Sequence, residues 1–227
     1  MQLKHIEHPE DSILTGDLSV LNWFTTESKI SLKIDGTPSI VWGTNPESGN
    51  FFVGTKSVFN KKKIKINESH ADIDINHDGE VADILHACFS CLPVTEDIIQ
   101  GDFIGFGYES TFQPHLLVYQ FPDTISNEII IAPHTVYDCP SGELKDAVAS
   151  ALDYKLTSFD EVLFVQPDVE FGVTTNIIER CKFAKQMAQL VDFVSDKDAR
   201  HIKKRLNQCI REGIEVGFDS NLISFWK

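Results

Sequence analysis

Lys33 and Asp35 place an amine and a carboxylate two residues apart in an otherwise apolar stretch. The two alternate with Leu32 and Ile34, so in an extended strand both polar side chains leave by the same face. Gly36, which follows, allows the backbone to come close to a neighbour. This pattern can hold an amine beside a carboxylate in a pocket, and it also fits a surface ion pair at the end of a strand.

A β-hairpin is the element that we expect to position this amine. Residues 30–42 and 51–56 have the pattern of strands, and residues 44–50 between them are rich in Asn, Pro, Ser and Gly, which favour turns. An antiparallel hairpin follows from this pattern. It carries Lys33 on its first strand and Lys56 on its second.

Two other groups of polar residues have side chains of the types that bind metals. Near the start these are His5, Glu7, His8 and Asp11. Residues 71–81 resemble a calcium loop, with Asp74, Asn76 and Asp78 alternating before Gly79, but Leu85 stands where such a loop has its bidentate carboxylate. A helix that starts at Asp78 is the competing interpretation of the second group.

Composition and charge exclude several classes of protein. The chain has 227 residues and a net charge of −14, which argues against a surface coated with cations for nonspecific nucleic-acid binding. Five lysines between residues 56 and 65 are a local exception and could guide a phosphate. No apolar run is long enough for a membrane span, and the start is unlike a signal peptide. The five cysteines are scattered, so we expect a reducing, cytoplasmic compartment, with Cys88 and Cys91 buried in a helix.

The remaining periodicity predicts an α+β body followed by helices. We expect strands over residues 98–108, 115–121, 128–137 and 161–165, and helices over residues 18–24, 141–152 and 176–214. A shift in composition near Thr174 divides the chain into an antiparallel-sheet body, residues 1–174, and a helical segment, residues 175–227. The helical segment is either a separate part or an incomplete end of the same domain.

Four short blocks occur in the order found in one enzyme superfamily. Lys33 to Gly36 form K-x-D-G, followed by VGTKS at residues 53–57, GDFIG at 101–105 and VYQF at 118–121. Together they resemble the lysine-adenylating nucleotidyltransferases, which include ATP-dependent DNA ligases, RNA ligases and mRNA capping enzymes. The third block usually has Glu where this chain has Asp102. The resemblance implies an antiparallel-sheet fold like that of a ligase adenylation domain.

The resemblance also implies a reaction. Lys33 would attack the α-phosphate of ATP to form a covalent lysyl-AMP, and the AMP would pass to a nucleic-acid end, RNA or DNA, or to another acceptor. A Mg²⁺ ion would offset the charge on the phosphates, and Asp102 would bind either this ion or the ribose. The implied nucleotide-binding residues are Asp35, Gly36, Lys56, Asp102 and Tyr119, with Phe121 as the second choice for the ring that stacks on the purine.

The chain is also similar, over residues 3 to about 175, to an uncharacterised family of phage-encoded proteins. The shared features are an H-φ-E-H opening, the K-x-D-G hairpin, Phe59-Asn60-Lys61 and Ile99-Gln100-Gly101-Asp102. This likeness implies residence in the host cytoplasm or in a virion.

The distal motifs of the nucleotidyltransferases, E-G-φ-V and K-x-K, have only imperfect matches here. These are residues 170–173, 182–185 and 212–214. A second chain could supply them. The alternative function is a catalytically degenerate phage structural or interaction protein that keeps the fold.

Overall fold

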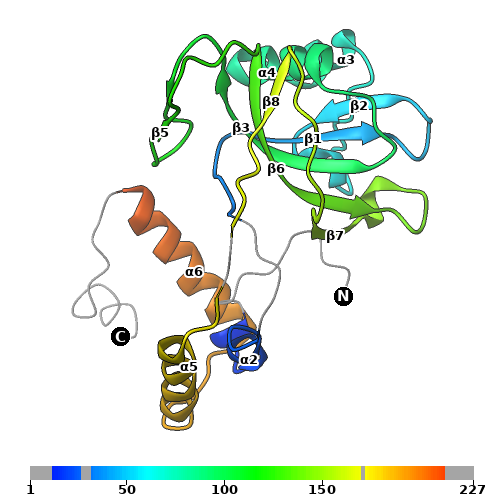
Figure 1. The fold of residues 1–227 in the computed structure, drawn as a ribbon. Coiled ribbons are helices and arrows are strands. Elements are labelled where there is room, and N and C mark those ends of the chain that lie inside the picture. Colours follow the sequence, from blue (N-terminus) through cyan, green and yellow to red (C-terminus); the bar gives the residue numbers. More distant parts are fainter. Residues whose placement is uncertain (1–11, 27–31, 170–171, 213–227) are drawn as a thin grey trace. The chain divides into compact units, whose positions relative to one another are not determined.

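The computed structural model describes residues 12–26, 32–169 and 172–212. The chain forms two compact units, each described by itself below (Figure 1). Residues 1–6 and 31–169 belong to the sheet unit, and residues 7–30 and 170–227 belong to the helical unit. The sheet unit therefore contains Lys33, Asp102 and Tyr119, three of the predicted site residues.

A six-stranded sheet forms the centre of the sheet unit, with the strand order β2-β1-β3-β6-β7 and β8 paired to β6. The strands are β1 (Ser39–Thr44), β2 (Phe51–Gly54), β3 (Ile98–Phe106), β6 (Ile129–Asp138), β7 (Val148–Ala151) and β8 (Val162–Phe164). Within the described part of the chain, β8 pairs with β6 in parallel and the other neighbours are antiparallel. Two short strands, β4 (Thr111–Phe112) and β5 (Tyr119–Gln120), form a separate pair.

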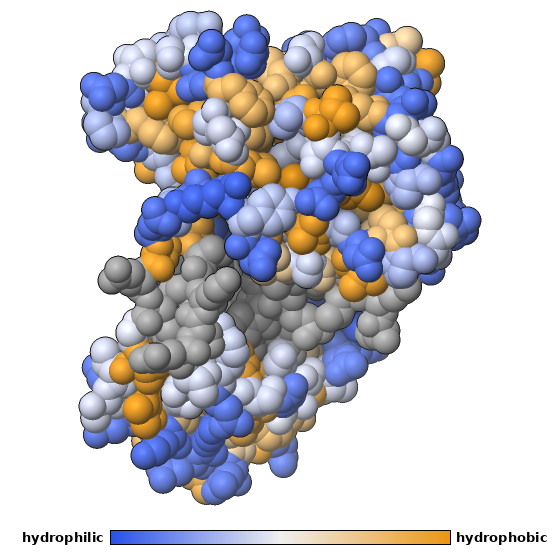
Figure 2. Space-filling view, turned by 45° about the vertical axis from the view of Figure 1, so that its right-hand side comes forward, coloured by the Kyte–Doolittle hydropathy of each residue, from blue (hydrophilic) through white to orange (hydrophobic). Residues whose placement is uncertain are grey.

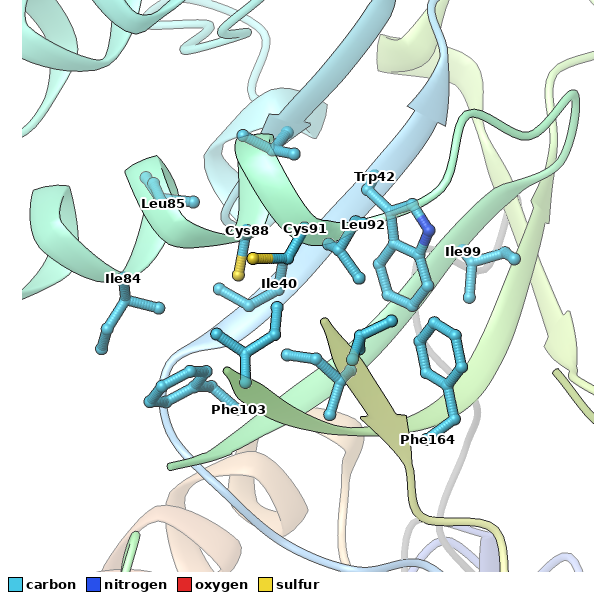
Figure 3. Packing of buried hydrophobic residues seen from close by; sticks show 14 of the residues in the cluster. Ile40, Trp42, Ile84, Leu85, Cys88, Cys91, Leu92, Ile99, Phe103 and Phe164 are labelled. Carbon is cyan, nitrogen blue, oxygen red and sulfur yellow. The ribbon is translucent and has the colours of Figure 1, made fainter. Parts of the chain in front are cut away.

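Helix α4 (Gly79–Cys91) packs its apolar side against one face of this sheet. Figure 3 shows Ile84, Leu85 and Cys88 of α4 in the buried cluster that also contains Trp42 and Phe103 of the strands. These side chains are almost fully buried, so the helix is held by the removal of apolar surface from water. Helix α3 (His70–Asn76) precedes α4 and contacts it.

The other face of the sheet is covered by two 3₁₀ helices, η1 (Lys56–Phe59) and η2 (Leu144–Asp146). Val58 and Phe59 from η1 and Leu144 from η2 join Val41 and Phe52 in a second buried cluster. Neighbouring residues of a strand, such as Val41 and Trp42, thus enter different clusters, as the alternation of a strand buried on both sides requires. Figure 2 shows hydrophilic residues (blue) over the outer surface, with apolar residues (orange) between them.

The helical unit contains α2 (Ser19–Trp23), α5 (Thr175–Ala188) and α6 (Asp196–Arg211). Thr174 caps α5, because its side-chain oxygen accepts a hydrogen bond from the backbone N–H of Ile177. A hydrogen bond from Lys185 to Asn22 ties α5 to α2. Among the described residues, no helix combines the length and apolar character that crossing a membrane requires.

The α+β class and most of the expected elements are confirmed, including the helix near residues 18–24, strands β2, β3, β6 and β8, and the burial of Cys88 and Cys91 in α4. The expected antiparallel sheet needs a correction, since β8 is parallel to β6. The division into units falls at residues 169/170 and groups residues 7–30 with the C-terminal helices.

Three expectations about secondary structure were wrong. Residues 141–152 form η2 and β7 instead of a helix, because pairing of β7 with β6 overrides the local preference. The strand over 115–121 shrinks to β5, and Leu116 to Val118 are exposed. The first hairpin strand begins at Ser39, so Lys33 precedes it, and Lys56 starts η1 instead of lying in a strand.

We predict that Leu85→Ala lowers the free energy of unfolding of the sheet unit by about 2–5 kcal/mol, because it leaves a cavity between α4 and the sheet. Ile75→Ala, on neighbouring α3, is the control: its side chain is 81% exposed, and the expected change is within about 0.5 kcal/mol. Urea unfolding, followed by far-UV circular dichroism, measures both. Equal losses in the two variants would contradict the packing described for α4.

Candidate functional site

Lys33 and Asp102, 69 residues apart in the sequence, meet at the surface of the sheet unit. The Nζ atom of Lys33 lies 2.8 Å from Oδ2 of Asp102 and also donates to the carboxylate of Asp35. The side chain of Lys33 is 47% exposed, whereas that of Asp102 is only 5% exposed. The amine is therefore accessible from solvent while one of its two carboxylate partners is buried.

Backbone pairing with β3 holds the segment that carries Lys33. The N–H of Thr37 donates to the carbonyl of Phe103, and the N–H of Phe103 donates to the carbonyl of Pro38, each at 3.0 Å. Gly36 lies so close to β3 that a Cβ atom added there would come within 2.2 Å of the Phe103 carbonyl oxygen. The glycine of K-x-D-G is thus required by contact with a backbone atom that cannot move aside.

The register of β1 against β3 sets the surroundings of Asp102. Ser39 is directly opposite Asp102 in this pair, and its hydroxyl donates to Oδ1 of Asp102 at 2.7 Å. His134, on β6, places Nε2 3.5 Å from the same oxygen. Each oxygen of the buried carboxylate therefore faces a partner, and the partners come from three separate parts of the chain.

A network of polar side chains continues from Asp102 into the sheet. Nδ1 of His134 lies 2.7 Å from the hydroxyl of Thr135, and its Nε2 lies 3.4 Å from the amide nitrogen of Gln100. The hydroxyl of Tyr137 donates to the side-chain oxygen of Gln100 at 2.6 Å. These contacts satisfy buried polar groups and hold the imidazole beside Asp102.

The pKa of Asp102 is lowered from its ordinary value, and the pKa of Lys33 is raised. Burial by itself would raise the pKa of Asp102, but its interactions with His134, Lys33 and Ser39 outweigh burial and hold that pKa well below the usual range. Burial would lower the pKa of Lys33, and the carboxylates of Asp102 and Asp35 outweigh it and raise that pKa above the ordinary value. In this state Lys33 is an ammonium and Asp102 a carboxylate at neutral pH.

Tyr119 joins the site through its hydroxyl group. The N–H of Asp35 donates to this hydroxyl at 3.0 Å, and the hydroxyl donates to the carbonyl of Asp35 at 2.9 Å. The ring packs against the buried cluster that contains Ile104 and Phe112, and Phe121 packs there as well. Tyr119 thus connects the segment that carries Lys33 to the core. The stacking of its ring on a purine stays a prediction.

The other predicted residues lie outside this cluster. Lys56 is exposed at the start of η1. The ion pairs of the site join Lys33 to Asp35 and to Asp102, and Asp102 to His134. The described residues contain no group of three or more His, Cys, Asp or Glu that could hold a metal ion. The predicted calcium loop instead spans the end of α3 and the start of α4, where Asp78 is the N-cap residue as expected, without a capping side-chain hydrogen bond.

Several predicted residues cannot be placed. His5, Glu7, His8 and Asp11 lie outside the described residues, as do Glu170, Phe171 and residues 213–214 of the distal matches. Residues 182–185 lie in α5, which confirms a helix where the K-x-K motif would need a strand.

Ser39 and His134 are the site residues that the sequence did not reveal. Ser39 lies four residues after Asp35 and enters the site only because β1 pairs with β3 in one particular register. His134 lies in a strand that was predicted, but the contact of that strand with β3 joins segments distant in sequence. Knowledge of the strand order and of the register would have found both residues.

We predict that Asp102→Asn costs about 1–3 kcal/mol of unfolding free energy at pH 7, because a neutral amide lacks the negative charge that forms an ion pair with the Lys33 ammonium. A carboxyl whose native pKa is lowered stabilises the fold above its unfolded pKa, about 3.9, and this contribution is lost as pH falls below it. The difference in unfolding free energy between wild type and Asp102→Asn should therefore become smaller in acid. Urea unfolding at pH 7 and near pH 3 measures it, and a gap that stays constant would contradict the pKa assigned to Asp102.

One family model matches residues 3–225, which is nearly the whole chain; its description is "Family of unknown function (DUF6267)". No curated protein and no solved structure matches the chain. The geometry above is thus that of a family whose activity has to be inferred from the site itself. The extent of the match shows that this chain is a member of the family DUF6267.

Proposed function

We propose that this protein is an ATP-dependent nucleotidyltransferase in which Lys33 becomes covalently adenylated. The observation that carries the proposal is the contact of Lys33 with Asp102, which brings together the K-x-D-G block and the third block of the superfamily. An accessible amine beside two carboxylates is suited to meet the phosphates of a nucleotide. In the reaction, Nζ attacks the α-phosphorus of ATP, an N–P bond forms, the bond to the β-phosphate oxygen breaks, and pyrophosphate leaves.

The proton on Lys33 is the main requirement of this step. Nζ carries a proton in excess while it is paired with Asp35 and Asp102, and an ammonium has no lone pair with which to attack. Ser39 and His134 keep Asp102 in place when its pair with Lys33 loosens, so the amine can separate from Asp102 and lose a proton to water. The half-exposed position of Lys33 leaves a path for that proton.

The carboxylates fit a Mg²⁺ ion of the kind that enters with a nucleotide. Such an ion is held by one or two carboxylates and mostly by phosphate oxygens and water, so a cluster of three protein ligands is not needed. Asp102 and Asp35 both contact one amine and would supply those carboxylates. When bound, the ion would offset the negative charge of the phosphates and of the leaving pyrophosphate.

We place the nucleotide and the acceptor by the same reasoning. Gly36 leaves the backbone near Lys33 free of a Cβ atom, and Tyr119 fixes that backbone. Lys56 would contact phosphate only if η1 lies beside the bound nucleotide. The acceptor that we propose is a nucleic-acid end, and a second chain that supplies a metal-binding glutamate and phosphate-binding lysines would complete the site.

A second candidate function is a non-catalytic phage structural or interaction protein with the same fold. It is favoured by one specific observation: Lys33 is fully engaged as an ammonium between two carboxylates, so its role could be to tie residues 32–36 to β3. In that case Lys33→Ala would lower stability and no nucleotide would become attached.

We predict that incubation with ATP and Mg²⁺ adds one AMP to the protein and that Lys33→Ala abolishes the addition. Lys155→Ala is the matched control, because Lys155 is also half-exposed and paired with a carboxylate, that of Asp168, at 2.6 Å. Intact mass spectrometry measures the adduct. A wild-type protein that gains no AMP, including in the presence of a neighbouring encoded chain, excludes the enzymatic function, and an adduct that survives Lys33→Ala excludes the assigned nucleophile.

We further predict that the rate of AMP attachment rises with pH. Because the pKa of Lys33 is raised, the fraction of free amine grows about tenfold per pH unit below that pKa, and the rate should follow it between about pH 6 and 9. Single-turnover mass spectrometry at several pH values gives the rate. A rate that is constant or falls across this range would contradict an ammonium as the resting form.

A further inference from the structure

The sheet unit and the segment that contains α5 and α6 carry opposite net charge. Residues 32–169 hold eight Lys and Arg against twenty-one Asp and Glu, whereas residues 172–212 hold nine Lys and Arg against five Asp and Glu. The net charge of −14 therefore hides a basic helical region. A positive net charge that is concentrated in a short segment attracts an anionic partner.

Helix α6 places part of this charge on one exposed face. Lys197, Arg200 and Lys204 follow one another at intervals of three and four residues, which puts them on the same side of a helix. All three are exposed. Adjacent members of this row, which we call the basic face, are separated by about 5–6 Å at their Cβ atoms.

The opposite side of α6 is apolar and buried. Ala199, Ile202 and Cys209 are each less than one-tenth exposed, so this side is covered by other residues of the chain. Ser195 begins the helix by accepting a hydrogen bond from the N–H of Asp198, whose carboxylate accepts one from the Ser195 hydroxyl. The basic face is thus displayed by a helix that is anchored along its other side.

We propose that the basic face of α6 binds the phosphodiester backbone of a nucleic acid. Lysine and arginine donate charge-assisted hydrogen bonds to phosphate oxygens, and a row of them can follow a strand. This binding surface does not depend on the adenylation of Lys33, since it uses side chains of the helical unit alone.

Two competing assignments are less well supported. Lys61, Lys62 and Lys63 form another exposed basic cluster, but they belong to the acidic sheet unit, whose charge repels a polyanion. An anionic lipid surface is the competing partner, because Phe183 and Met187 of α5 are exposed. A basic helix that lies on a membrane inserts its own apolar side, and in α6 that side is buried.

The test measures binding of the full-length protein to a fluorescein-labelled single-stranded RNA of about 20 nucleotides, and to a duplex of the same sequence, by fluorescence anisotropy without ATP at about 50 to 200 mM NaCl. The triple variant Lys197→Gln, Arg200→Gln, Lys204→Gln removes the charge of the basic face. The matched control removes three charges from the other cluster: Lys61→Gln, Lys62→Gln, Lys63→Gln. A variant that keeps the charge, Lys197→Arg, Arg200→Lys, Lys204→Arg, controls for the folding of α6.

We expect wild type to bind RNA or duplex with a steep salt dependence, and the basic-face variant to bind at least about tenfold more weakly, with a slope of log affinity against log salt reduced by about two to three. The charge-keeping variant, the control and Lys155→Ala should bind like wild type. Because binding is measured without ATP, failure of the adenylation hypothesis leaves this result unchanged. Absence of binding at low salt, equal loss in the control, or binding to phosphatidylserine vesicles in place of both oligonucleotides would overturn the proposal.

Discussion

The buried carboxylate of Asp102 constrains the arrangement of the whole site. A buried charge is costly unless it is paired and hydrogen-bonded, and Asp102 obtains its partners from three parts of the chain. Lys33 comes from the segment before β1, Ser39 from the start of β1, and His134 from β6. Because these partners lie on both sides of β3, a shift in the register of either neighbouring strand would remove part of the interactions that stabilise the buried carboxylate.

The same constraint explains the K-x-D-G block in physical terms. The lysine meets the buried carboxylate, the aspartate shares the amine, and the glycine lets the backbone touch the carbonyl of Phe103. The block is therefore adapted to fit against a neighbouring strand, in addition to the chemistry that we propose for Lys33. The ammonium state of Lys33 is the resting arrangement of such a block, and an incoming nucleotide would have to draw the amine away from Asp102.

Sequence patterns were sufficient for the long apolar elements and insufficient for pairings between distant strands. Strands β3 and β6 and helix α4 carry long apolar runs, and they were predicted correctly. The prediction of a helix over residues 141–152 was wrong, because β7 forms through its pairing with β6 and not from a local pattern. In the site, Lys33, Asp35 and Asp102 were predicted together and do meet, while Ser39 and His134 depend on strand register, which local patterns do not reveal.

We propose that chemistry and nucleic-acid binding are separated in this protein, with the adenylated lysine in the acidic sheet unit and the basic face in the helical unit. The central claim is that a nucleotide occupies the site with its α-phosphate at Lys33. A crystal structure with a non-hydrolysable ATP analogue and Mg²⁺ tests this claim most directly. The account predicts that Nζ of Lys33 lies about 3–3.5 Å from the α-phosphorus, in line with the leaving oxygen. A nucleotide bound elsewhere on the protein, with Lys33 still paired to Asp102, would contradict it.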